Sequence, residues 1–199
     1  MDREEHVPLE HHIALMSDST AWVKTGLQLL DSADLIWATV VRGIHMFGIL
    51  CEIAEASPDH RYEESLEQRR MVLEGIAMGG PFRLLAGYAI ENLLKAVHVR
   101  RRVLKNEPIV NDQGNLQGIR GDHNYVELAK RELGETISPE EELLLCRLSL
   151  AVLWAGRYPG NKKVPGQTDW IQAYGSGRDD RDQVRALADR IIRVHDGLG

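Results

Sequence analysis

The chain has few of the features that mark secreted, membrane or metal-binding proteins. Its two cysteines, Cys51 and Cys146, sit in apolar helical contexts without the spacing of metal ligands, so we expect buried thiols in a reducing compartment rather than a disulfide. The N-terminus is acidic and leads into no apolar segment, which is not the pattern of a signal peptide. No uncharged run reaches membrane-spanning length. These absences predict a cytoplasmic protein with no membrane partner.

Strand patterns and linkers are also missing. No stretch shows the strict alternation of apolar and polar residues that marks a half-buried strand, and no Pro/Ser/Gly-rich linker divides the 199 residues. Charged residues at 27% and hydrophobic residues at 43% are ordinary for a folded protein. The net charge of −6 argues against a surface built entirely for nucleic acid, but it leaves room for a local basic patch. The sequence therefore predicts one all-α domain over residues 1–199, an antiparallel helical bundle.

The most apolar part of the chain is residues 81–105, where a helix would be buried on most of its circumference. Its proline suits a first turn, and its last turns carry four cations, which the helix dipole favours. Gly87, Glu91 and Lys95 fall four residues apart and form one narrow stripe. Two interpretations of this stripe remain open. It is either part of a functional site or a structural salt bridge beside a glycine that admits a neighbouring helix.

Capping residues and helix breakers predict the other elements. A helix should begin near Ser17–Thr20 and run as one or two helices to about Ile53. An amphipathic segment from Tyr62 should end at Gly79-Gly80-Pro81. Further helices should cover residues 123–133, the segment after the capping box Ser138-Pro139-Glu140-Glu141, and residues 179–195. Residues 106–122 are predicted to form a loop or small hairpin, and residues 155–177 to be non-helical.

The histidines do not form a recognisable metal site. His11 and His12 are adjacent, so on a helix they point to different faces. His45 lies in an apolar run with no cysteine, histidine or carboxylate one turn away, which predicts a hydrogen-bonded core histidine. The sequence thus indicates neither a metal nor a cofactor.

Three segments carry a resemblance to a known family. They are residues 89–96 with Glu91 and Lys95, the segment His123-Asn124-Tyr125-Val126-Glu127-Leu128, and the corner Gly156-Arg157-Tyr158-Pro159 after an apolar helix. In this order they resemble the HEPN superfamily (higher eukaryotes and prokaryotes nucleotide-binding), in the branch with an Arg-Tyr-Pro corner. The resemblance implies a HEPN-like bundle over residues 61–197 after an N-terminal helical extension, residues 1–60. Bundles of this family usually pair, so it also implies a homodimer.

The resemblance gives an expectation about chemistry. Catalytic members are metal-independent RNases with an arginine and a histidine separated by four to six residues near the start of the last bundle helix. After Arg157 the corresponding positions hold Lys162, Lys163 and Val164, so the histidine is absent. An ordinary lysine does not titrate near neutral pH and cannot replace it as a base. We therefore expect a phosphate site without intact RNase chemistry.

Guanidinium and ammonium groups suit phosphate oxygens. The predicted phosphate-binding or RNA-binding residues are Arg157, Tyr158, Lys162, Lys163 and Lys95, with Glu91 and His123 in support. Glu91 has a second interpretation as a structural partner of Arg157, and His123 is interpreted first as a helix cap and second as an acid–base group. The cations near residues 100–105 would steer RNA or serve only the helix dipole.

Two functions follow from these features. In the first, the protein binds RNA or a nucleotide in a prokaryotic toxin–antitoxin, defence or stress context. In the second, it is a noncatalytic dimeric helical scaffold, or a partner of a nucleotidyltransferase, an antitoxin or another effector. Because the helix at residues 81–105 has more apolar surface than one bundle is expected to cover, we expect a homodimer with an apolar interface.

Overall fold

The computed structural model describes residues 9–56, 66–119, 123–134, 137–155 and 180–198. Within these ranges six helices pack together and no strand occurs, which confirms the all-α prediction. The helices are α1 (Leu9–Ser17), α2 (Ser19–Ala56), α3 (Leu66–Leu104), α4 (Tyr125–Leu133), α5 (Pro139–Ala155) and α7 (Asp180–Asp196).

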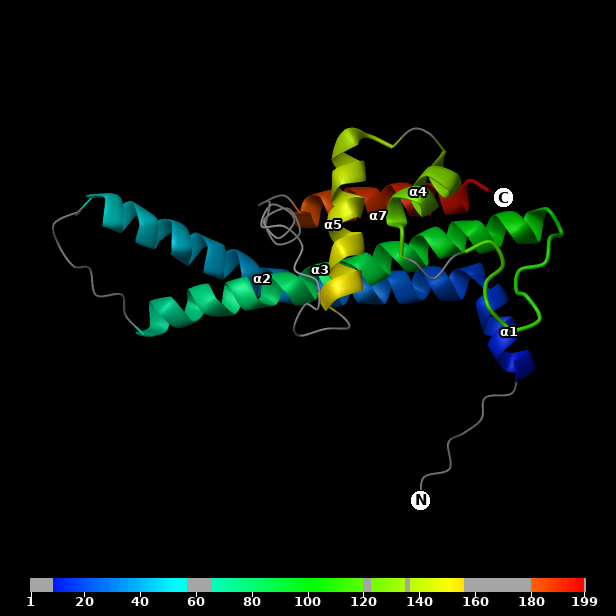
Figure 1. Ribbon diagram of the computed structural model, residues 1–199, viewed down its shortest axis with the longest axis horizontal. Coiled ribbons are helices and arrows are strands. Elements are labelled where there is room, and N and C mark those ends of the chain that lie inside the picture. Colours follow the sequence, from blue (N-terminus) through cyan, green and yellow to red (C-terminus); the bar gives the residue numbers. More distant parts are fainter. Residues whose placement is uncertain (1–8, 57–65, 120–122, 135–136, 156–179, 199) are drawn as a thin grey trace, which may run out of the picture.

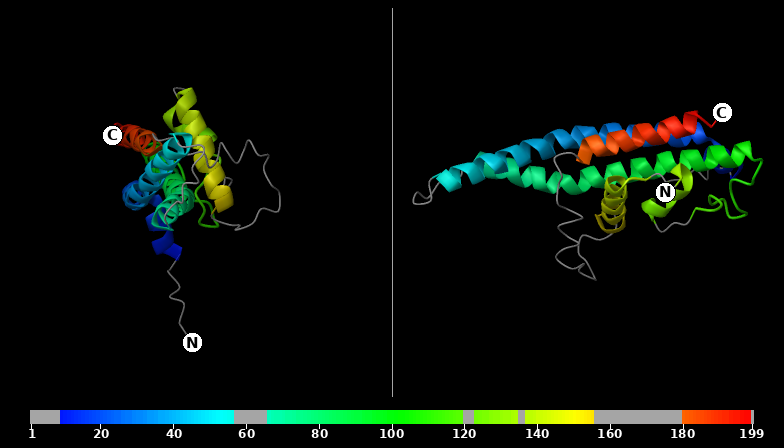
Figure 2. Two further views of the ribbon diagram at one scale, coloured as in Figure 1. Left: turned by 90° about the vertical axis from the view of Figure 1, so that its left-hand side faces the viewer. Right: turned by 90° about the horizontal axis from the view of Figure 1, so that it is seen from above.

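Helices α2 and α3 are the two long helices at the centre of the fold. They run side by side in opposite directions, and α7 lies along them while α5 crosses α3 steeply (Figures 1 and 2). Asp18 caps α2 by accepting a hydrogen bond from the Thr20 amide at 2.9 Å. From there α2 continues without a break, so it is one helix and not two. The N-terminal segment is therefore a full partner of α3 in the core.

One end of this pair projects beyond the other helices (Figure 1). We call this projection, residues 41–56 of α2 and 66–80 of α3, the arm. By length and composition, the Ser19–Ile53 segment of α2 would also be able to cross a membrane, and 17% of its most apolar window is buried in the chain. Core helices of soluble proteins can have the same composition, so this feature alone assigns no location.

The predicted helix end at Gly79-Gly80-Pro81 is wrong, because α3 continues through Pro81. An interior proline removes a hydrogen bond and costs about 3 kcal/mol. Packing against α2 continues on both sides of it: Val72 and Phe82 are buried, and the Phe82 ring lies 4.5 Å from that of Trp37. We infer that this burial offsets the local cost of the proline.

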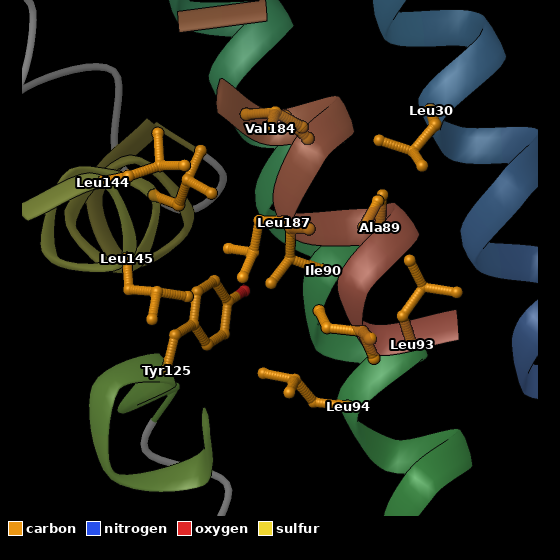
Figure 3. Close-up of a cluster of buried hydrophobic side chains, with 14 of the residues drawn as sticks. Leu30, Ala89, Ile90, Leu93, Leu94, Tyr125, Leu144, Leu145, Val184 and Leu187 are labelled. Atoms are coloured by element: carbon orange, nitrogen blue, oxygen red, sulfur yellow. The ribbon is translucent and has the colours of Figure 1, made fainter. Parts of the chain in front are cut away.

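The core surrounds the middle of α3. Leu93 and Val97 are 1% and 0% exposed, as predicted, whereas Leu85 packs at the edge and is only partly buried. Figure 3 shows Ala89, Ile90, Leu93 and Leu94 of α3 surrounded by Leu30 of α2, Tyr125 of α4, Leu144 and Leu145 of α5, and Val184 and Leu187 of α7. The chain itself therefore covers the apolar surface of α3 that we expected to be covered by a second copy.

Gly87 lies where α5 crosses α3. A Cβ atom there would lie 2.7 Å from Val152 Cγ2 and 3.2 Å from the Leu148 carbonyl oxygen. The glycine therefore admits a neighbouring helix, which is one half of the structural interpretation of the Gly87–Glu91–Lys95 stripe.

Replacing Gly87 by alanine is expected to lower the free energy of unfolding by about 1 to 3 kcal/mol, because α5 would have to move away. Gly79→Ala in the same helix is the matched control, since nothing lies within 4 Å of its added Cβ. The control should instead stabilise the helix by roughly 0.5 to 1 kcal/mol. Urea unfolding of both variants measures the difference. Equal effects would mean that the crossing tolerates a methyl group.

Several local predictions are confirmed. Ser138 and Glu141 form the capping box of α5, with the Glu141 amide donating to Ser138 Oγ at 3.2 Å and the Ser138 amide donating to Glu141 Oε2 at 2.9 Å. An isolated antiparallel bridge between Val110 and Leu116 forms the small hairpin. These features depend on neighbouring residues only, which explains why the sequence predicts them.

Three side chains expected in the core are exposed instead. Cys51 and His45 lie on the outer surface of the arm, and Cys146 lies on the outer face of α5. An apolar run in the sequence does not show on how many sides a helix is covered. On α5 only the face with Leu145 and Leu148 meets the core, and among the described helices none lies along the outside of the arm.

Candidate functional site

A cavity of about 570 Å³ opens beside the middle of α3. It is lined by Glu91 of α3, by Gly118, Ile119, His123 and Asn124 of the connection, and by Tyr125, Glu127, Leu128 and Arg131 of α4. Two of the sequence-predicted site residues, Glu91 and His123, therefore meet in one place.

Glu91 is the centre of a polar cluster that joins α3 to α4. Its Oε1 lies 2.7 Å from Lys95 Nζ. Its Oε2 accepts a hydrogen bond from the Tyr125 hydroxyl at 2.9 Å and lies 3.0 Å from His123 Nδ1. The carboxylate is only 10% exposed. Each oxygen of this buried carboxylate thus has a partner, as buried charges require.

The cluster keeps Glu91 ionised and Tyr125 neutral. Burial raises the pKa of Glu91, but the charge of Lys95 and the hydrogen bonds from Lys95, Tyr125 and His123 outweigh it and leave this pKa below its ordinary value. Burial, and then the charge of Glu91, raise the pKa of the Tyr125 hydroxyl far above its usual range. Tyr125 is therefore a fixed hydrogen-bond donor to Glu91.

His123 is not the helix cap that we expected. Asn124 caps α4, its side chain accepting from the Glu127 amide at 3.2 Å. His123 has a φ of 53°, a left-handed conformation. Its Nδ1 lies beside the Glu91 carboxylate, which can only accept, so Nδ1 carries a proton and donates to Glu91. Among the described residues Nε2 has no hydrogen-bond partner, so it is available to a ligand in the cavity.

Lys95 has internal partners and does not line the cavity. Besides Glu91, its ammonium lies 5.2 Å from the centre of the Trp22 ring, a cation–π contact. The pair with Glu91 confirms the structural salt bridge at helical spacing. The role of Lys95 as a phosphate contact stays a prediction.

Arg131 is a cavity residue that the sequence did not single out. Its Nη1 donates to the Gly118 carbonyl oxygen at 2.6 Å and its Nε to Glu132 Oε1 at 2.8 Å. The side chain is 46% exposed. Both contacts hold the guanidinium at the cavity wall while leaving other N–H groups for a ligand. Nothing in the sequence distinguishes Arg131 from the neighbouring Lys130.

Glu132 and His98 form a second buried cluster, which holds Arg131 at the cavity wall. Glu132 is 2% exposed and lies 2.9 Å from His98 Nδ1. The other ring nitrogen of His98 lies 2.8 Å from the Gln117 carbonyl oxygen. Burial raises the pKa of Glu132, but hydrogen bonds from His98 and Arg131, with their charges, keep it below the ordinary value. Glu132 is therefore an ionised anchor for the guanidinium of Arg131.

The other predicted phosphate contacts lie outside the described residues. These are Arg157, Tyr158, Lys162 and Lys163, so pairing between Glu91 and Arg157 stays a prediction as well. Within the part of the chain that the structure describes, no group of three or more histidine, cysteine or acidic side chains is placed to hold a metal ion.

No family model matches this chain, and neither a curated protein nor a solved structure is significantly similar to it. Its function is therefore inferred first from the cavity and the residues that line it.

Proposed function

We propose that the chain binds a phosphate-bearing ligand, RNA or a nucleotide, in the cavity between α3 and α4. The observation that carries this proposal is that His123, oriented by Glu91, and Arg131, held by Glu132, line the same cavity. Guanidinium and imidazolium groups are good donors to phosphate oxygens. The cavity volume of about 570 Å³ is in the range of small-molecule sites.

Each wall of the cavity has a chemical role in this proposal. Arg131 contributes a permanent positive charge for a phosphate group. Protonated at Nε2, His123 donates to a phosphate oxygen; neutral, it accepts a hydrogen bond from a ribose hydroxyl. Ile119 and Leu128 offer apolar surface to a base.

The HEPN-like resemblance extends this proposal. In it, Arg157, Tyr158, Lys162 and Lys163 supply further contacts to the RNA or nucleotide, and a nucleotidyltransferase or antitoxin is the partner in a toxin–antitoxin, defence or stress context. His123 supplies the acid–base group that is absent after Arg157. Binding is the proposed function, and proton transfer by His123 would be an addition to it.

A noncatalytic helical partner is the second candidate. The Glu91 cluster favours it, because Lys95, Tyr125 and His123 satisfy the carboxylate without any ligand. In that case the cluster only ties α4 to α3.

The test is a binding titration with a short oligoribonucleotide and with AMP. Arg131→Ala removes a charge-assisted contact, so we expect binding about ten-fold to a hundred-fold weaker. Lys130→Ala is the matched control, since it removes one positive charge from the neighbouring residue, which does not line the cavity. His123→Gln keeps a donor for Glu91 but cannot be protonated, and it should also weaken binding.

Thermal melts of the same variants separate a binding defect from unfolding. Folded wild-type protein that binds neither probe would contradict the proposal and favour the noncatalytic partner. Equal losses in Lys130→Ala and Arg131→Ala would show that only general charge attraction is present.

A further inference from the structure

We propose that the arm pairs with the arm of a second copy of the chain, so that a homodimer forms through residues 41–56 and 66–80. This interface is separate from the cavity, and it holds whether or not the cavity binds a ligand. It also differs from the dimer expected from the sequence, which would use the centre of α3.

The centre of α3 has little apolar surface left for a partner. Ala89, Ile90, Leu94 and Val97 are each 0% exposed within the single chain. Figure 3 shows Ala89, Ile90 and Leu94 surrounded by side chains of α2, α4, α5 and α7, and Val97 belongs to the same buried cluster. A second copy could reach this surface only by displacing part of the core.

The arm, by contrast, exposes large apolar side chains. Phe47 and Leu73 are 55% and 59% exposed, and Val41 and Met78 are 44% and 38% exposed. These residues come from both helices of the arm. Together these four exposed side chains offer apolar surface to a partner.

The arm is built as a thin and closely packed pair. A Cβ atom on Gly43 would lie 2.5 Å from the Cα of Gly75, so the two backbones touch at this point. Side chains cannot fill a space between helices that lie so close together. Val72 is buried near this contact, whereas Phe47 and Leu73 lie on the outside of the arm, where a partner can reach them.

A groove at the base of the arm offers a receptor for a partner side chain. It has a volume of about 420 Å³ and is lined by Trp37, Val41, Arg42, Ile44 and His45. An apolar side chain from a second arm would fill it in the way that knobs fill holes in helical bundles. Two arms together would form a four-helix bundle, the usual way for helix pairs of this kind to cover an apolar face.

Charge favours a second copy over lipid or nucleic acid as the occupant. The arm carries three cations, Arg42, Arg69 and Arg70, and four carboxylates, Glu52, Glu55, Glu67 and Glu74. Nearly balanced charge lets two identical arms approach without net repulsion. Charged residues of both signs are costly within a bilayer, and a surface without excess positive charge does not attract nucleic acid.

Sedimentation of the full chain at micromolar concentration tests the interface. Wild type is expected to be a dimer, and Leu73→Asp or Phe47→Asp should raise the dimer dissociation constant by about ten-fold or more. Leu104→Asp is the matched control, because Leu104 is a leucine of the same helix with 53% exposure against 59% for Leu73, but it lies outside the arm. Circular dichroism should show that all three variants keep the helical fold.

A monomeric wild type would overturn the proposal, and so would a dimer that Leu104→Asp weakens as much as Leu73→Asp does. Flotation with vesicles of neutral and anionic phospholipid distinguishes a membrane as the occupant. Wild-type protein that floats with vesicles, when Leu73→Asp does not, would assign the arm to lipid and contradict the dimer.

Discussion

Replacing Glu91 by alanine is expected to lower the free energy of unfolding by about 3 to 5 kcal/mol. The substitution leaves the Lys95 ammonium, the Tyr125 hydroxyl and His123 without the carboxylate that they share. Because these groups are largely buried, water cannot fully replace the lost partner. Chemical denaturation monitored by circular dichroism measures the change.

The matched control is Glu74→Ala in the same helix. Glu74 also belongs to an i,i+4 pair, with Arg70, but both side chains are largely exposed, at 45% and 78%. An exposed pair contributes about 0.3 to 0.5 kcal/mol, so this variant should be close to wild type. If the two variants lost equal stability, the cluster at Glu91 would be no more than another surface ion pair.

The dependence of stability on pH follows from the same carboxylate. The pKa of Glu91 in the folded chain lies below its ordinary value of 4.5, so the folded state binds fewer protons than the unfolded state in acid. Its stabilising contribution is complete above 4.5 and is lost as the pH falls through the lowered pKa. Glu91→Gln should therefore lose less melting temperature on acidification than wild type does. An identical acid dependence would contradict this account.

Asp180→Ala is the second substitution expected to have a large effect, again about 3 to 5 kcal/mol. Asp180 is 2% exposed at the start of α7, with Oδ2 3.2 Å from Arg83 Nη2. Its Oδ1 lies 3.0 Å from Arg147 Nη2, an ion pair without hydrogen-bond geometry. Removing the carboxylate leaves two cations close together, one of them almost fully buried. Urea unfolding at neutral pH measures the loss.

Asp182→Ala is the control for Asp180, because both aspartates lie in the first turn of α7 and have the same relation to the helix dipole. The side chain of Asp182 is 82% exposed, and its Oδ1 lies 3.7 Å from Arg181 Nη1. This variant should lose less than about 1 kcal/mol. A similar loss in both variants would assign the effect to the dipole and not to the buried ion pairs.

Local signals account for the parts of the fold that the sequence predicts. The capping box at Ser138 and Glu141, the start of α7 and the pair of Glu91 with Lys95 each involve residues within one helical turn. Pro81 shows where local reasoning fails, because burial of α3 against α2 on both sides outweighs the preference of proline for a helix end.

The sequence predicts only part of the site, because the contacts that form it join residues far apart in the chain. Glu91 meets His123 and Tyr125 across 32 and 34 positions, and no spacing rule predicts contacts at such separations. Arg131 becomes distinctive only because Glu132 and the Gly118 carbonyl oxygen hold it at the cavity wall. The exposed Cys51 and His45 have the same origin, since a hydropathy pattern does not reveal that no third helix in the described part of the chain packs along the arm.

The most direct test of phosphate binding in the cavity is an NMR spectrum of the histidine side chains during titration with AMP and with inorganic phosphate. The imidazole signals of His123, assigned through His123→Gln, are expected to shift as ligand is added. The signals of His98 should stay in place, because both of its ring nitrogens face Glu132 and Gln117. Unchanged His123 signals at saturating AMP and phosphate would contradict the account.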